Sequence, residues 1–176
     1  PDQWLTHLQA DTIVAFFGYN ESFDGPNRVA NYEGELDAFA AYTLSRAYNG
    51  KAAPRLVLVS PIAYENLSKN HDLPTGVKEN ANLALYAAAM QRVAKKHNLT
   101  FIDLFTPTKE SYDTAKEPFT SNGFIPNEKG YEKLAVLLAN GLYGQSSYMS
   151  KAKPELVMGA VKQKDWFWHN DYGILN

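Results

Sequence analysis

Three short apolar runs alternate with longer amphipathic stretches along the chain. The runs cover residues 12–17, 55–60 and 100–104. Runs of this length with almost no polar side chain predict strands that are buried on both faces of a parallel sheet. After each run, apolar residues recur at helical spacing, at about 32–48, 78–97 and from 127 onward. This order predicts an α/β fold with three layers, α/β/α, in which right-handed crossovers join parallel strands.

Residues that typically start or stop helices and strands lie between these segments. Asn49-Gly50 is expected to stop the first helix, and Pro61 to end the second strand. Asn127 is expected to be the N-cap of the last core helix. Residues 105–122, between the third strand and this helix, are expected to form a long loop.

The pattern changes after residue 143. We therefore expect an α/β domain over residues 1–143 and an aromatic-rich extension over residues 144–176, with a short amphipathic stretch at 154–161. Three strands make a small sheet, and the first of them is predicted to be a long apolar edge. We expect this edge to be paired, either by sheet strands that precede Pro1 or by another chain.

Composition and charge narrow the class of function. The formal net charge is −2 and no basic stripe is present, which argues against a nucleic-acid partner. No apolar run approaches the roughly 20 residues that a membrane span needs. Cysteine is absent, which excludes disulfides, thiol nucleophiles and thiolate metal sites. We expect no cofactor and no metal, because typical i+3 or i+4 metal spacing is missing around the histidines, which are His7, His71, His97 and His169.

The most informative motif follows the first apolar run. Gly18-Tyr19-Asn20-Glu21-Ser22 places an amide side chain and a bare backbone N–H at the carboxyl edge of the predicted sheet, where open α/β proteins build their sites. An amide donor held there suits the developing oxyanion of an acyl-transfer reaction. The alternative is an Asx turn in which Asn20 satisfies nearby backbone groups. Ser22 lacks the Gly-x-Ser-x-Gly context of a nucleophile, so we expect its hydroxyl to bond to the backbone, and Ser146 to lie in a solvated linker.

Several motifs, in order, resemble those of SGNH (GDSL-type) esterases and lipases. Gly18-Tyr19-Asn20-Glu21 resembles the family's third block, Gly-x-Asn-Asp/Glu. Residues 119–131 look like its last block, in which Asp-Gly-x-His precedes a helix that often opens Asn-x-x-Gly-Tyr. Residues 59–62, 80–86 and 101–105 look like the matching half of such domains. The resemblance covers about residues 1–143 and extends to the SGNH-like modules of planctomycete-type multidomain proteins, which also carry haem-binding or dehydrogenase-like modules.

The resemblance implies a flavodoxin-like, SGNH-type fold and a serine esterase that acts on acyl or acetyl esters, carbohydrate esters among them. The family's first two blocks, which carry the Ser nucleophile and a Gly, have no counterpart here. By the resemblance, Asn20 is an oxyanion-hole donor, and Gly18 lets the loop turn close to the substrate. Asn122 stands at the position of the family's Asp and Ile125 at the position of its His. Ile125 cannot accept a proton, and Asn122 can orient a histidine but cannot stabilise an imidazolium as a carboxylate does.

Other residues are candidates for the edges of this site. Glu21, Glu65 and Asn66 are candidate substrate contacts, with loop solvation as the alternative for the pair after the second strand. His169, within the aromatic segment 166–171, is a candidate replacement base, with packing or partner contact as the alternative. The aromatic side chains of the tail suit either stacking on a sugar or contact with a partner.

The sequence thus supports two main hypotheses. In the first, the chain is the C-terminal half of an SGNH-type hydrolase domain that residues upstream of Pro1 complete. In the second, it is a degenerate SGNH module that binds a ligand or partner without hydrolysis. The intact motif at residues 18–21 favours the first, and Ile125 favours the second. A third hypothesis is a flavodoxin-like binding domain that is unrelated to hydrolases.

Overall fold

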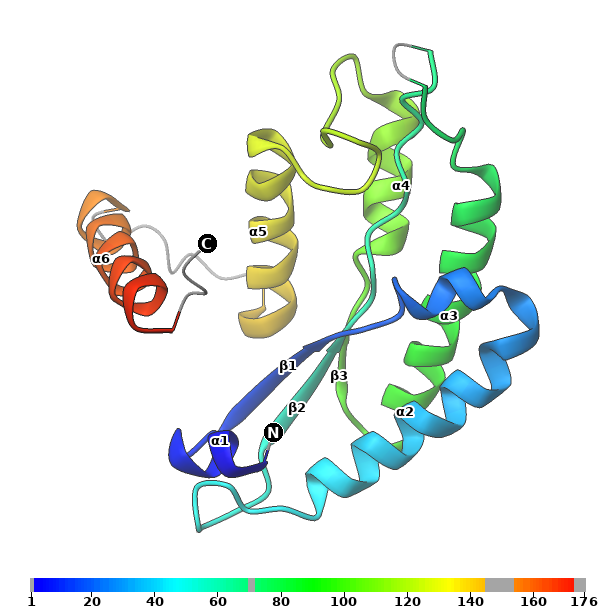
Figure 1. Cartoon of the computed structure of the whole chain (residues 1–176). Coiled ribbons are helices and arrows are strands. Elements are labelled where there is room, and N and C mark those ends of the chain that lie inside the picture. The colour runs from blue at the N-terminus through cyan, green and yellow to red at the C-terminus, as the bar shows by residue number, and fades with distance from the viewer. Residues whose placement is uncertain (1, 70–71, 145–153, 173–176) are drawn as a thin grey trace. The chain divides into compact units, whose positions relative to one another are not determined.

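Three parallel strands form the sheet of this protein. The structure is a computed structural model, and it describes residues 2–69, 72–144 and 154–172 (Figure 1). The strands are β1 (Thr12–Phe16), β2 (Arg55–Val59) and β3 (Thr100–Ile102), in the order β1-β2-β3. Leu58, near the carboxyl end of the central strand, pairs with Ala15 on one side and Phe101 on the other. The parallel α/β fold that the apolar runs predict is confirmed.

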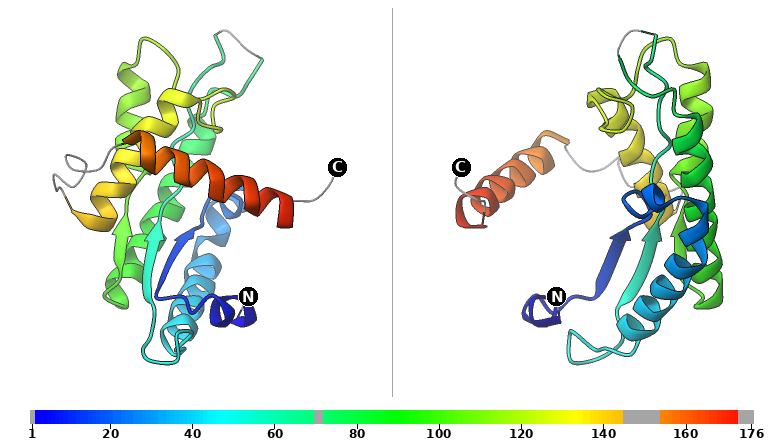
Figure 2. Two further views of the ribbon diagram at one scale, coloured as in Figure 1. Left: turned by 90° about the vertical axis from the view of Figure 1, so that its left-hand side faces the viewer. Right: turned by 45° about the vertical axis from the view of Figure 1, so that its right-hand side comes forward.

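Helices cover both faces of the sheet. α2 (Val29–Leu44) and α3 (Val77–Lys96) pack together on one face, and α5 (Glu128–Tyr143) covers the other (Figures 1 and 2). The three layers leave the carboxyl ends of the strands at one edge, which is where the motif at residues 18–22 lies.

The apolar character of β2 follows from this arrangement. Successive side chains of a strand point to opposite faces, so β2 is apolar at each of its buried positions, Leu56 to Val59. Leu58 is buried with Met90 of α3, whereas Val57 is buried with Leu134 of α5. Full burial of one such side chain stabilises the fold by ~1.5–3 kcal/mol. The central strand therefore joins two hydrophobic cores.

The prediction of a loop over residues 105–122 is wrong for the first half of this segment. This part forms α4 (Phe105–Thr114). The buried hydroxyl oxygen of Ser60, directly after β2, accepts the N–H of Leu104 at 2.9 Å and of Phe105 at 3.1 Å. The Ser60 hydroxyl thus satisfies donors of the first helical turn from a distant part of the chain. Asp103 Oδ1 adds a local cap by accepting the N–H of Thr106 at 3.1 Å.

Some elements and boundaries differ from those expected from the sequence. Three short helices were not expected, namely α1 (Asp2–His7), η1 (Glu21–Asp24) and η2 (Pro26–Arg28). α2 ends at Leu44, earlier than expected, because the N–H of Gly50 closes a separate turn on the carbonyl of Ala47 (2.9 Å). The N-cap of α5 is confirmed, since Asn127 Oδ1 accepts the N–H of Gly130 at 3.0 Å.

The chain divides into two compact units, residues 1–142 and 143–176. In the second unit, α6 (Pro154–Tyr172) is longer than the expected stretch at 154–161. Within the described ranges, no helix is both long and apolar enough to cross a membrane. Two residues singled out in the sequence, His71 and Ser146, lie outside the described residues.

β1 is an edge strand in this structure. Among the described residues it pairs only with β2. The side chain of Phe16, at its carboxyl end, is 58% exposed. β3, at the opposite edge, is three residues long. The longer and more apolar of the two edges is therefore the one next to the candidate site.

Candidate active site

A tight turn follows β1, and a hydrogen bond from Gly18 to the side chain of Glu21 closes this turn. Gly18 has a φ of 95°, and its N–H donates to Glu21 Oε2 at 2.9 Å. The backbone N–H that the sequence predicts to be bare is therefore already bonded, so Gly18 provides the conformation of the turn rather than a free donor. Ser22 is buried and its hydroxyl donates to the carbonyl oxygen of Tyr19 at 2.6 Å, which confirms a backbone-bonded serine.

The amide of Asn20 remains available at this turn. Asn20 is exposed and directly precedes η1, yet its side chain makes no capping hydrogen bond there. No other hydrogen bond of this side chain occurs within the described part of the chain, so the Asx turn is not formed. An amide with two unused N–H donors at a strand end can bind a carbonyl oxygen or an anion.

Asn20 lies in the wall of an apolar cleft with a volume of about 820 Å³. The cleft lies between the carboxyl end of β1, the first turns of α5 and the loop before α5. Glu21 and Asn20 are the polar residues on the β1 side, and the rest of the lining is largely apolar, including Phe16, Ile62, Leu104, Phe124, Leu134 and Leu138. A mainly apolar cleft with a few convergent polar groups is the usual form of a small-molecule site.

The loop of residues 118–126 is fixed by Glu65. This side chain is 4% exposed, and its carboxylate accepts the N–H of Phe119 (3.0 Å) and both the N–H and the hydroxyl of Thr120 (2.7 and 2.6 Å). Its backbone N–H also donates to the carbonyl oxygen of Gly123 at 2.7 Å. Charge-assisted bonds of this kind are strong when they are buried. The geometry thus favours a loop-fixing role for Glu65 over the substrate contact expected from the sequence.

Asn122 and Ile125, which stand at the family's Asp and His positions, have different surroundings. Asn122 is exposed, and its Oδ1 accepts the N–H of Phe124 (3.1 Å) and of Ile125 (2.7 Å), so the amide shapes its own turn. Ile125 is 51% exposed and lines the cleft beside Asn20. The structure therefore brings Asn20, Glu21 and Ile125 together in one cleft and does not bring the side chain of Asn122 into it.

An aromatic pair joins the two loops of the cleft. The ring of Tyr19 stacks on the ring of Phe124 with 12° between the planes. Burial raises the pKa of Tyr19, so its hydroxyl stays protonated at neutral pH. Sequence reasoning missed this contact, since aromatic residues in two loops far apart in the sequence give no sign that they meet.

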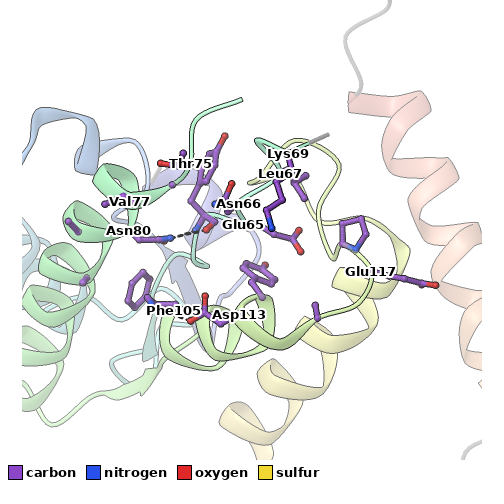
Figure 3. A pocket seen from close by; sticks show the side chains of 18 of the residues that line it. Glu65, Asn66, Leu67, Lys69, Thr75, Val77, Asn80, Phe105, Asp113 and Glu117 are labelled. Carbon is purple, nitrogen blue, oxygen red and sulfur yellow. Dashed lines mark hydrogen bonds and ion pairs between the residues drawn. The ribbon is translucent and has the colours of Figure 1, made fainter. Parts of the chain in front are cut away.

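A second cavity, of about 910 Å³, lies beside the cleft-forming loops and is shown in Figure 3. Asn66 and Lys69 come from the loop after β2, and Asn80 comes from α3. The side chain of Asn80 bonds to both the N–H and the carbonyl oxygen of Tyr64, which fixes that loop (2.8 Å each). Asn66 therefore lies at a different cavity from Asn20, and its role as a substrate contact stays a prediction.

The described residues of the first unit supply no histidine to the cleft. His7 ends α1, where its ring packs against Trp4, and His97 follows α3, where Nε2 lies 2.7 Å from Asp37 Oδ1. His169 belongs to α6 of the second unit, so its role as a replacement base stays a prediction. In the described ranges, no cluster of three or more His, Asp or Glu side chains is placed to hold a metal ion.

Comparison with known families identifies the class of protein. The sequence model of the GDSL-like lipase/acylhydrolase family matches residues 1–133. The chain belongs to this family. The match includes both loops of the cleft, so the resemblance drawn from the Gly-x-Asn-Glu motif is confirmed, whereas the likeness to planctomycete-type modules stays a prediction. A search of curated proteins found no match.

Solved structures of hydrolases share the fold. An alpha/beta hydrolase enzyme from the metagenome of Lake Arreo, Spain, superposes with a TM-score of 0.60 at 18% identity, over 80% of this chain and 63% of that one. The acetylxylan esterase Axe2 from Geobacillus stearothermophilus gives 0.59 at 15% identity, over 78% and 62%. A lipase/acylhydrolase from Enterococcus faecalis gives 0.54 at 22% identity, over 77% and 62%. The chain thus spans less than two thirds of the length of these structures.

Proposed function

We propose that the Asn20 cleft is the oxyanion side of a GDSL-type ester-hydrolase site, with acyl or acetyl esters, including esters of carbohydrates, as substrates. The observation that carries this proposal is the free amide of Asn20 at the carboxyl end of β1. In the reaction, its N–H donates to the substrate carbonyl oxygen, which becomes negatively charged when a nucleophile attacks. Glu21 contributes by holding the Gly18 turn that carries Asn20.

The nucleophile and the base come from outside the described cleft in this proposal. Ser22 is bonded to the backbone, and Ile125 has no proton acceptor. A segment N-terminal to this chain, or another chain, supplies the serine and the base. Fold relatives that include an acetylxylan esterase and a lipase/acylhydrolase support esters as the substrate class.

One specific observation favours an alternative function. Ile125 lines the cleft at the position of the family's histidine. An apolar side chain there suits a module that binds an ester or a carbohydrate and does not hydrolyse it. In that case Asn20 remains a binding residue, and the chain is a degenerate member of the family.

Incubation with p-nitrophenyl acetate and a fluorophosphonate probe separates these functions. The chain is tested by itself and with the sequence upstream of Pro1 restored. We expect probe labelling and burst release of nitrophenol with the upstream sequence present. Absence of both from the longer protein, with ester binding retained in calorimetry, would establish the degenerate module instead.

Replacement of Asn20 by Ala tests the oxyanion role. In the active protein we expect kcat to fall roughly 10²–10³-fold, because one preorganised oxyanion donor is lost. Asn31→Ala, at an exposed position of α2, is the matched control and should leave kcat unchanged. Equal rates for Asn20→Ala and the control would contradict the proposal.

We also infer that the free edge of β1 is paired in the working protein by a strand from another chain or from an N-terminal segment. Two cavities flank this edge strand. The Asn20 cleft lies toward α5 and contains Phe16, and a smaller cavity toward α2 contains Phe17 and Phe39. A strand added at this edge would cover both and would satisfy the unpaired backbone groups.

A further inference from the structure

The hydroxyl of Tyr32 has no hydrogen-bond partner within the described residues, although it is buried. Tyr32 lies in the first turn of α2 and is 6% exposed. Its ring packs on Tyr86 with 4.9 Å between ring centres, so the hydroxyl cannot swing out to solvent. A buried polar group without a partner is unfavourable, and a phenylalanine would fill the same space without it. The retained hydroxyl therefore points to a role beyond packing.

This hydroxyl lies beneath the Gly18–Glu21 turn. The oxygen is 3.3 Å from the place where a Cβ on Gly18 would stand. Tyr32 and Glu21 also line one small cavity of about 150 Å³. Glu21 Oε2 accepts the Gly18 N–H, whereas Oε1 has no hydrogen bond within the described part of the chain. Burial, and then the charge of Glu21, raise the pKa of Tyr32, so the phenol keeps its proton and can donate it.

We propose that Tyr32 is a positioning residue whose hydroxyl donates, through a single bridging water, to the free oxygen of Glu21. The bond would hold the Glu21 carboxylate against the Gly18 N–H and so fix the direction of the Asn20 amide. The cavity between the two side chains is large enough for a bridging water. The part of this inference that concerns catalysis rests on the proposed function of Asn20.

Replacement of Tyr32 by Phe in the full chain tests the role. We expect the Gly18 amide to exchange with solvent roughly tenfold faster. Without the Tyr32 hydroxyl, the Glu21 carboxylate that accepts the Gly18 N–H is held less firmly. In the active protein, kcat for p-nitrophenyl acetate should fall while KM stays constant.

Tyr86→Phe is the matched control. The Tyr86 hydroxyl donates to the carbonyl oxygen of Gly25 at 2.9 Å, so this variant should lower the Tm. An unchanged Gly18 exchange rate in Tyr32→Phe, whatever its Tm, would overturn the inference. If the wild-type protein does not hydrolyse esters, the proposed function fails, and the exchange rate still decides the role of Tyr32.

Discussion

At the scale of single residues, the site depends on backbone positions that only certain residues can occupy. Gly18 adopts a left-handed φ that other residues reach only with strain. It also lies in close contact with Met90, Pro61 and Tyr32, each of which has an atom 3.3 Å from a Cβ built on Gly18. The turn that presents Asn20 thus requires glycine for both conformation and space.

Gly18→Ala should destabilise the protein by about 1–3 kcal/mol, the usual cost of a residue held in an unfavourable backbone region. Urea denaturation measures this change. Gly34→Ala is the control, because Gly34 lies inside α2 with no atom within 4 Å of an added Cβ. That variant should gain about 0.4–1 kcal/mol. A neutral Gly18→Ala would show that the turn adapts.

Glu65→Gln should weaken the attachment of the loop of residues 118–126. The amide keeps the shape of the carboxylate, but its NH₂ group would face N–H donors of Phe119 or Thr120. We expect a loss of roughly 2–4 kcal/mol in the free energy of unfolding, because a buried charge-assisted network is broken. Glu110→Gln, at an exposed position of α4, should change stability little. Equal stability of the two variants would contradict the loop-fixing role.

At the scale of elements, charged side chains join α2 to the end of α3. Asp37 of α2 lies 2.8 Å from Lys96 Nζ and 2.7 Å from His97 Nε2. Hydrogen bonds from Lys96, and then from His97, lower the pKa of Asp37 below its ordinary value. A lowered carboxyl pKa means that the folded state favours the charged form. The contacts of Asp37 with Lys96 and His97 therefore add stability only while Asp37 is ionised.

The pH dependence of this contact has a definite sign. Its contribution is present above the ordinary Asp37 pKa of 3.8 and disappears as the pH falls through the lowered value of the folded state. The Tm difference between the wild type and Asp37→Asn should therefore be present at neutral pH and vanish in strong acid. Asp113→Asn, which removes only the exposed contact with Lys109, is the control. A difference that persists in strong acid would refute this assignment.

Much of the element order could be predicted because burial leaves a local pattern. Val57 and Leu58 face opposite cores, so the buried part of β2, residues 56–59, is apolar and easily recognised. α4 was missed because the cap of its first two N–H groups, the hydroxyl of Ser60, is far away in sequence, although Asp103 is a local signal that was overlooked. For the site, the Gly18–Glu21 motif directed attention to the Asn20 amide, whose role stays a prediction. The role of Glu65 depends on a contact with Thr120, 55 residues along the chain.

At the scale of the whole molecule, the sheet ends in an unprotected strand. The N–H groups on the open side of β1 have no partner among the described residues. If the proposed strand pairs there, these N–H groups should exchange slowly in the working protein and rapidly in this chain by itself. Hydrogen exchange measured with and without the upstream sequence, or at increasing protein concentration, checks this. Rapid exchange under every condition would mean that the edge stays open.

The attachment of the 118–126 loop through Glu65 has a consequence for how this site can change over evolution or by design. The loop is held by the backbone of residues 119, 120 and 123 and not by the side chains at the family's catalytic positions. Ile125 can therefore be exchanged with little effect on the shape of the loop, and an Asp at 122 would keep the oxygen that accepts the N–H groups of Phe124 and Ile125. An Asp at 122 and a His at 125 would therefore be placed on a loop whose attachment does not depend on them.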